Sequence, residues 1–237
     1  MTENKSELEE KGFSIINNIY TSEEIIEMGI MLDSIDTSKS VFRKSEDLFA
    51  IRQFLKEVPQ IKKRIFNNRF KNVLNTIAGG DYFLVKSIYF DKPEKSNWFV
   101  SYHQDLTISV DSKQNIEDFN HWTSKHNQFA VQPTIDIIEN IITLRIHLDN
   151  TDENNGALKV IENSHSKKIY RPETIDFMIE KETFCNVNAG GIMIMKPLLL
   201  HGSNRTTNTK RRRVIHLEFA NKQLPEPLQW AEYDSLK

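Results

Sequence analysis

The stretch WFVSYHQDLTISV (residues 98–110) combines the pattern of a β-strand with two residues that can bind a metal ion. Aromatic and β-branched residues dominate it, as they do in strands. Because side chains alternate between the two faces of a strand, His103 and Asp105 would point the same way, with Cα atoms ~6.7 Å apart. Their imidazole and carboxylate can share one ion at that spacing. A His-x-Asp pair alone is also found in hydrogen-bonded and surface positions.

Five further segments after residue 80 have the same strand-like composition and are bounded by turn formers. They are DYFLVKSIYF (81–90), IITLRIHLDN (141–150), GALKVIENS (156–164), GGIMIMKPLLLHG (190–202) and RRRVIHLEFA (211–220). Six strands predict a mainly β protein, an antiparallel sandwich or barrel with α-helices packed outside it. The segment 111–132 is long and polar for a connector, so we expect a binding loop or lid there.

Residues 1–80 are predicted to be mostly helical. Thr21 and Glu24 form a capping box before an apolar stripe, which predicts a helix over 22–35. A second helical pattern follows Ser45 and continues to Pro59, where a helix must kink or restart. A third helix is expected to end at the Gly79-Gly80 pair. No repeat or low-complexity linker divides the sequence, so we expect one domain over 1–237 with its β core at 81–220.

The composition excludes several classes of function. With 31 Lys+Arg against 33 Asp+Glu, the formal net charge is −2, and Arg211–Arg213 is the one dense basic cluster, so no nucleic-acid surface is expected. The single cysteine, Cys185, excludes an intramolecular disulfide framework. The charged N-terminus has no signal-peptide core and no stretch could span a bilayer, so we expect a cytoplasmic protein without a membrane partner.

The last third of the sequence supplies a third candidate ligand. GGIMIMKPLLLHG is interpreted as a strand that ends near His201, and the next strand begins with three arginines. Two histidines and one carboxylate on one face of an iron ion leave three positions open, two for an oxoacid and one for dioxygen. A nearby arginine can bind the far carboxylate of that oxoacid through two parallel hydrogen bonds.

These motifs together resemble the phytanoyl-CoA dioxygenase family of Fe(II)- and 2-oxoglutarate-dependent oxygenases. The resemblance runs from about Phe83 to Ala220, through NWFVSYHQDLTI, TLRIHLDNTDENNGALKVIENSH and KPLLLHGSN…RRRVIHLEFA. It implies a double-stranded β-helix (jelly-roll, cupin-like) core that uses Fe(II), 2-oxoglutarate and O2. One departure is the tetrapeptide Glu162–His165, which replaces the family's Pro-Gly-Ser-His and puts the turn geometry there in doubt.

The resemblance also implies the roles of five residues. It makes His103, Asp105 and His201 the iron ligands, and it places Arg212 and Ser203 on the distal carboxylate of 2-oxoglutarate. Asp105 stands where related halogenases carry a small residue that leaves a coordination site for chloride. The resemblance therefore indicates hydroxylation or another oxidation rather than halogenation.

The spacing from His201 favours Arg212 over its two arginine neighbours, and strand alternation offers a check. If Arg212 points into the pocket, Val214, His216 and Glu218 share its face. If Arg213 points inward instead, the inward set is Ile215, Leu217 and Phe219, which is typical of an ordinary apolar core. A strand that lines a polar cofactor pocket fits the first set.

Four more residues are candidates for the substrate pocket or for contacts around the iron ligands. Arg145 and His147 lie two apart on one predicted strand face, and either lining the pocket or facing outward is consistent with the sequence. Gln132 follows the irregular segment that could cover the site. His216 could compete with His201 as a ligand, although a supporting position on an inner strand is the preferred interpretation.

The function implied by the resemblance is hydroxylation of a C–H bond, with release of succinate and CO2. The substrate would be a small metabolite, an amino acid or a natural product. Two other functions stay open: a non-catalytic jelly-roll binding or sensing protein, and a metal-dependent hydrolase or isomerase on a cupin-like barrel. The sequence determines neither the primary substrate nor the oligomeric state.

Overall fold

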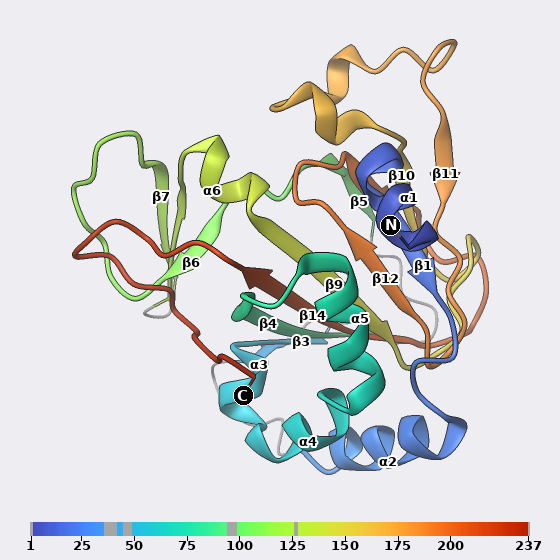
Figure 1. The fold of residues 1–237 in the computed structure, drawn as a ribbon. Helices are drawn as coiled ribbons and strands as arrows, with labels where there is room; N and C mark the ends of the chain where they lie inside the picture. The colour runs from blue at the N-terminus through green and yellow to red at the C-terminus, as the bar shows by residue number, and fades with distance from the viewer. Residues whose placement is uncertain (1, 36–41, 45–48, 94–98, 126–127, 237) are drawn as a thin grey trace.

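The computed structural model describes residues 2–35, 42–44, 49–93, 99–125 and 128–236, and its largest element is an antiparallel seven-stranded sheet (Figure 1). In spatial order the strands are β1 (Phe13–Ile16), β12 (Ile192–Met195), β9 (Ile141–His147), β14 (Arg212–Ala220), β4 (Phe83–Lys92), β3 (Phe49–Arg52) and β2 (Phe42–Lys44). Neighbours in this order are far apart along the chain. The sheet is therefore held together by long-range pairing.

A second antiparallel sheet carries most of the His-Asp motif. Its strands, in spatial order, are β11 (Glu182–Phe184), β10 (Leu158–Ile161), β13 (His201–Ser203) and β5 (Val100–His103). It faces the large sheet, because a carboxylate oxygen of Asp105, just after β5, lies within 4.8 Å of side-chain atoms of His216 and Glu218 on β14. Two facing antiparallel sheets of this connectivity form the expected double-stranded β-helix, or jelly-roll.

The large sheet has one apolar and one polar face. On the apolar face, alternate residues of β9 and β14, among them Leu144, Ile146, Ile215 and Leu217, pack in the main hydrophobic cluster beneath the helices. Residues between them in the sequence, such as Arg145, point to the opposite face, toward the small sheet. Burial of the apolar face holds the helices in place, and the polar face is left to line the space between the sheets.

Helices cover the apolar face (Figure 1). The α-helices are α1 (Glu3–Lys11), α2 (Ser22–Asp33), α3 (Phe54–Glu57), α4 (Lys62–Ile65), α5 (Asn68–Ala78) and α6 (Ile135–Glu139). The 3-10 turns are η1 (Pro59–Ile61), η2 (Ser164–Lys167) and η3 (Pro172–Thr174). The capping box of Thr21 and Glu24 at α2 is confirmed, as is the end of α5 before Gly79. None of the helices within the described ranges is long and apolar enough to cross a bilayer.

The second expected helix is wrong in its first half. Residues 45–48 lie outside the described residues, and Phe49–Arg52 forms strand β3 instead of a helix. β3 pairs with β4 and buries Ala50 and Ile51, so the gain from joining the sheet exceeds the local helical preference. Helical structure starts only at α3, and Pro59 then opens the 3-10 turn η1.

The segment 111–132 is also more ordered than expected. It contains β7 (Asn120–Lys125) and β8 (Gln128–Gln132), which join β6 (Ile108–Val110) in a three-stranded sheet. An apolar cluster that includes Val110, Phe119 and Val131 packs beneath it. Half of the segment, residues 120–125 and 128–132, is therefore strand rather than irregular loop, and the expectation that the segment binds substrate or covers the site stays a prediction.

Candidate metal centre and co-substrate pocket

The His-Asp motif lies at the end of a strand and not inside one. β5 ends at His103, and Asp105 follows in an irregular segment, so the expected continuous strand is wrong. The strand ends there because the Asp105 N–H donates to the Pro197 carbonyl (3.0 Å), outside the strand ladder. His201 begins β13 rather than ending the strand before it. β13 pairs His201 directly with His103, which brings the two histidines side by side.

The three side chains converge on one point. His103 Nε2 lies 3.9 Å from Asp105 Oδ1, and His201 Nε2 lies 3.7 Å from Asp105 Oδ2. The two imidazole centres are 4.3 Å apart. Metal–ligand bonds of about 2.0–2.2 Å place the ligand atoms of a facial triad about 3–4 Å apart, so the geometry fits one ion. The His103 side chain is 44% exposed and that of His201 only 5%, so the site opens on the His103 side.

Both histidines are held in the tautomer that a metal requires. His103 Nδ1 contacts the Ser101 carbonyl and His201 Nδ1 contacts the Leu199 carbonyl, each at 2.9 Å. A carbonyl oxygen only accepts hydrogen bonds, so Nδ1 carries the proton in both rings. Each Nε2 therefore presents its lone pair to the space beside Asp105, which is the second-sphere arrangement typical of metal-binding histidines.

The protonation states are those of a ligand set. Burial lowers the pKa of His201 to about 4, so its ring is neutral at physiological pH. Burial alone would raise the pKa of Asp105, but its electrostatic interactions with the neighbouring His201 ring and with the Lys86 cation outweigh burial and hold that pKa well below its usual range. A neutral imidazole and an ionised carboxylate bind a divalent cation without first losing a proton.

Gln104 fixes the segment that carries Asp105, a role that the sequence did not reveal. Its side-chain amide donates to the carbonyls of Lys168 (2.7 Å) and Leu198 (2.5 Å) and accepts from the Tyr170 N–H (2.9 Å). These partners are 64 to 94 residues away along the chain. No local pattern could have predicted the contacts, and they clamp the metal motif between two loops.

The three consecutive arginines have different environments. Arg211 binds Asp91 (Nε–Oδ1 2.9 Å), and Arg213 binds Asp149 through two hydrogen bonds of 2.8 and 3.0 Å. Arg212 is buried, and its Nε and Nη1 have no hydrogen-bond partner among the residues that the structure describes. Burial lowers its pKa to about 9, so it remains charged at neutral pH. The structure thus directs Arg212 alone of the three into the interior.

Ser203 is a second buried polar group without a partner. Its side-chain oxygen makes no hydrogen bond within the described part of the chain, and the residue is 1% exposed on β13, two residues after His201. Between them lies Gly202, where a Cβ would come within 2.8 Å of the Val100 carbonyl oxygen. Glycine therefore lets β13 approach β5 closely, which keeps His201 opposite His103.

A polar row on the large sheet lies beside Asp105. Arg145 Nη1 contacts His216 Nδ1 at 3.0 Å, His216 Nε2 contacts Glu218 Oε1 at 3.0 Å, and Lys86 Nζ binds the same oxygen at 2.7 Å. Potential ligand atoms of Asp105, His216 and Glu218 all lie within 4.8 Å of one another. Because Lys86 and Arg145 already supply positive charge there, this cluster does not need a second cation.

The other two candidate residues have different positions. His147 is buried on β9, where its Nδ1 contacts Thr151 Oγ1 at 2.8 Å and its Nε2 has no hydrogen-bond partner among the described residues. Burial, together with the charges of Arg145 and Arg212, holds the pKa of His147 well below its usual range. Gln132 ends β8 in the three-stranded sheet, and no hydrogen bond of its side chain to another described residue connects it to the metal cluster.

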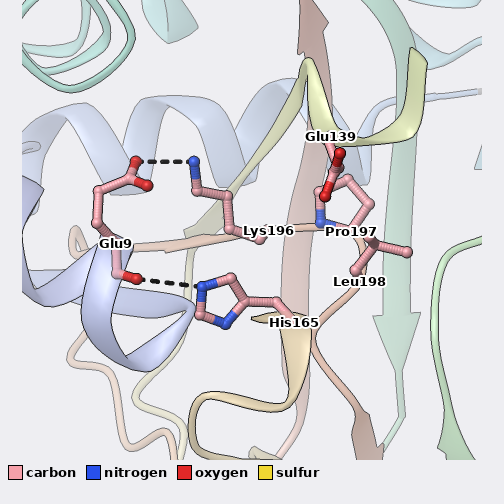
Figure 2. Close-up of a pocket in the computed structure, with 6 residues that line it drawn as sticks. All are labelled: Glu9, Glu139, His165, Lys196, Pro197 and Leu198. Carbon is pink, nitrogen blue, oxygen red and sulfur yellow. Dashed lines mark hydrogen bonds and ion pairs between the residues drawn. The ribbon is translucent and has the colours of Figure 1, made fainter. Parts of the chain in front are cut away.

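A hollow lies on the outer side of the loop that supports Asp105. Figure 2 shows its lining residues, which are Glu9, Glu139, His165, Lys196, Pro197 and Leu198. Its charged groups are already paired: Lys196 Nζ binds Glu9 Oε1 at 2.8 Å, and Glu139 binds Lys168. The His165 ring donates to the Glu9 carbonyl at 3.2 Å. These contacts attach α1 to the loop, so we assign the hollow a structural role.

The sequence model of the family described as Phytanoyl-CoA dioxygenase (PhyH) matches residues 8–214. The chain belongs to this family. It is therefore an enzyme of the Fe(II)- and 2-oxoglutarate-dependent class, with Fe(II), 2-oxoglutarate and O2 as its cofactor and co-substrates. The match begins within α1, well before the region in which the sequence motifs were evident. No curated protein matches the sequence.

Solved structures with the same fold belong to non-haem 2-oxoglutarate enzymes. The carbocyclase SnoK from nogalamycin biosynthesis superposes with a TM-score of 0.70 at 13% identity, covering 94% of this chain and 85% of that chain. The epimerase SnoN from the same biosynthesis gives 0.68 at 11% identity, covering 93% and 80%. HygX from Streptomyces hygroscopicus, with nickel, 2-oxoglutarate and hygromycin B bound, gives 0.67 at 13% identity, covering 95% and 89%. At these identities the likeness establishes the fold.

Proposed function

We propose that the protein hydroxylates a C–H bond of a small-molecule substrate, with His103, Asp105 and His201 as the iron ligands. In this proposal Arg212 and Ser203 bind the distal carboxylate of 2-oxoglutarate. The geometry of the His-Asp-His group supports the first part, because three Lewis-basic atoms converge with their protons held elsewhere. The second part is supported by Arg212 and Ser203, whose buried side chains have polar atoms without a hydrogen-bond partner among the described residues.

The observation that carries the proposal is the buried, unpaired guanidinium of Arg212. A buried donor without a partner costs about 1–3 kcal/mol, and more when it is charged. Arg212 Nε and Nη1 and Ser203 Oγ are all in this state. A carboxylate would neutralise the cation and accept from all three donors, and the planar guanidinium suits two parallel hydrogen bonds. 2-Oxoglutarate, which the family uses, supplies such a carboxylate.

When bound, Fe(II) would supply the redox chemistry, with O2 as the oxidant and 2-oxoglutarate as the co-substrate that is oxidised to succinate and CO2, and the side chains would supply position and protonation state. The carbonyls that fix Nδ1–H in both histidines keep the two Nε2 lone pairs aligned. Gln104 holds the segment with Asp105 against two loops, and Arg212 sets the direction in which 2-oxoglutarate lies. Holding the reactants in a fixed orientation is the main contribution that the protein can make.

The first experiment is an anaerobic titration of the purified protein with Fe(II) and 2-oxoglutarate, followed by the weak visible charge-transfer band of the chelate. We expect the band in the wild type and its loss in His201→Ala and Asp105→Ala, because each variant removes one ligand of the triad. Arg213→Lys is the matched control, since its partner Asp149 lies outside the pocket. A band of full intensity in both triad variants would overturn the assignment of the ligands.

Turnover separates the proposal from the other functions that the sequence left open. A hydroxylase forms succinate and an oxygenated product in equal amounts. The protein could instead bind iron and 2-oxoglutarate and yet form no succinate under oxygen with each compound that shifts the band. That result would favour a binding or sensing protein. Product formation that needs a divalent metal but no 2-oxoglutarate would favour a hydrolase or isomerase.

A further inference from the structure

We propose that the substrate is a small carboxylic acid that also carries an amino or hydroxyl group, held by Arg145, Thr143, Lys86 and Glu218. This inference rests on the proposed function, because it takes the His-Asp-His group as the iron site. It excludes a hydrocarbon acyl chain as the part of the substrate that lies next to the iron. The substrate class follows from the charges on the inner face of the large sheet.

The face of the large sheet that points toward the small sheet carries polar side chains from Arg212 along β14 to Glu218. Strand alternation on β14 places Arg212, Val214, His216 and Glu218 on the same face. Antiparallel pairing sets Arg145 opposite His216 and sets Thr143 and Lys86 on either side of Glu218. If 2-oxoglutarate lies against Arg212, the space next to it, beyond His216, is lined by Arg145, Thr143, Lys86 and Glu218. We call these four residues the wall.

These groups are next to the iron site rather than remote from it. Asp105 has a ligand atom within 4.8 Å of those of His216 and Glu218, and it interacts electrostatically with Lys86 and Arg145. A molecule that fills the space between Asp105 and the large sheet would therefore lie against the side that carries Lys86, Arg145 and Glu218. An alkyl chain there would remove water from three buried charges and give no hydrogen bond in return, which is unfavourable.

Two donors and one acceptor on this wall are unused by the described residues. Arg145 Nε and Thr143 Oγ1 are buried without a partner. Glu218 Oε1 accepts from both Lys86 and His216, whereas no described residue binds Oε2. A carboxylate satisfies the two donors, and an amino or hydroxyl group donates to Glu218 Oε2. The chemistry required is an acceptor and a donor on one small molecule.

The charge balance also calls for an anion. Lys86 and Arg145 are cations and Glu218 is an anion, so among the described residues one positive charge of this group has no counter-ion once Asp105 is committed to the iron. Burial lowers the pKa of Arg145 to about 10, so it is still protonated at neutral pH. A substrate carboxylate supplies the missing charge, and the bidentate geometry of a guanidinium favours it over a single hydroxyl.

The test uses the anaerobic Fe(II)/2-oxoglutarate complex and two sets of probes. Each probe is added up to tens of millimolar, or up to its solubility limit where that is lower. The polar set contains the proteinogenic α-amino acids and short 2- and 3-hydroxy acids. The apolar set contains octanoate and hexanoyl-CoA. Binding is measured by the shift of the charge-transfer band and by the change in melting temperature. We expect members of the polar set to shift both signals, and the apolar set to shift neither.

Variants connect the response to the wall. Thr143→Val removes the hydroxyl at nearly constant volume, and the double variant Lys86→Met/Glu218→Gln removes both charges of the pair together. Each is expected to weaken binding of the responding probe by about tenfold or more. Lys159→Met is the matched control, because Lys159 forms a 3.1 Å pair with Glu182 on the other face of the small sheet.

Three outcomes would contradict the proposal. They are a response to the apolar set, silence of the whole polar set, and a polar response that all the wall variants retain. The 2-oxoglutarate band separates these failures from failure of the proposed function. If the band persists while the polar probes are silent, only the substrate class is wrong. If the band is missing from the wild type, the co-substrate assignment itself fails.

Discussion

Arg212 and Arg213 are neighbours in the sequence with opposite environments, and the difference can be measured. We expect Arg212→Lys to weaken 2-oxoglutarate binding by about tenfold or more, because lysine keeps the charge but loses the two-bond fork, and hydrogen bonds to charged groups contribute about 1.5–3 kcal/mol. The band is titrated with 2-oxoglutarate at saturating Fe(II). Arg213→Lys should leave the affinity unchanged, since that side chain is paired with Asp149. Equal weakening in both variants would show that the effect is structural.

Gln104 acts through its neighbours, and its variants should reveal that. Gln104→Ala removes hydrogen bonds to the Lys168 and Leu198 carbonyls and from the Tyr170 N–H. We expect weaker Fe(II) binding together with a lower melting temperature, because the segment with Asp105 loses its clamp. Metal affinity is measured by competition with a chelator. Gln114→Ala is the control, since the side chain of Gln114 donates to the nearby Ser112 Oγ and to no other described residue. A lower melting temperature with unchanged Fe(II) affinity would contradict a positioning role.

Among the elements, the segment that follows β14 is fixed to β4 by a buried carboxyl group. Glu232 accepts from the Ser87 N–H (2.7 Å) and from Ser87 Oγ (2.5 Å), and Ser87 Oγ accepts from the Leu55 N–H (2.9 Å). Burial raises the pKa of Glu232 above its ordinary value of 4.5. The contribution of this group to stability is therefore complete below pH 4.5 and is lost as pH rises through the raised value.

The direction of this pH dependence gives a prediction for Glu232→Gln, whose side chain cannot titrate. We expect the unfolding free energy of the wild type, relative to that of the variant, to fall as the pH is raised from about 4.5 toward neutrality. Urea unfolding at a series of pH values measures it. Glu226→Gln, at an exposed position of the same segment, should show no such trend. A difference that grows with pH would mean that the carboxylate is stabilised in the fold.

The sequence predicted those elements whose local pattern agrees with their tertiary environment. The helix after Thr21 and the strand of Arg212 are examples, because their caps and alternation are encoded locally. β3 was missed because its strand conformation comes from pairing with β4, against its own helical pattern. Asp105 was wrongly assigned to a strand. The contact that ends β5 before it is a hydrogen bond from the Asp105 N–H to the Pro197 carbonyl, 92 positions away along the chain, which a local pattern does not reveal.

At the scale of the whole molecule, ligand binding should couple the two sheets, because the proposed ligands of iron and 2-oxoglutarate come from both. Mn(II) and 2-oxoglutarate, each at a hundredfold excess over its dissociation constant, should each add about 2.7 kcal/mol to the unfolding free energy. For a chain of this size each contribution raises the melting temperature by roughly 5–10 °C. Differential scanning fluorimetry measures the shift.

The Mn(II)-dependent part of this stabilisation should depend on the triad. His103→Ala is expected to abolish the Mn(II)-dependent shift, since it removes a ligand at the open side of the site. His121→Asn is the matched control: His121 is an exposed histidine on β7 with a positive φ of 53°, a conformation that asparagine tolerates. Retention of the full shift in His103→Ala would place the metal elsewhere.

β14 lies at the centre of the seven-stranded sheet, yet it is the last of the strands along the chain. During synthesis, β4 and β9 leave the ribosome before the strand that separates them, and each presents an unpaired edge until β14 arrives. Arg212 arrives with it, so the pocket is completed in the final step of folding. We therefore expect the nascent protein to be prone to aggregation, and its yield in a recombinant host to rise with slower translation or lower temperature.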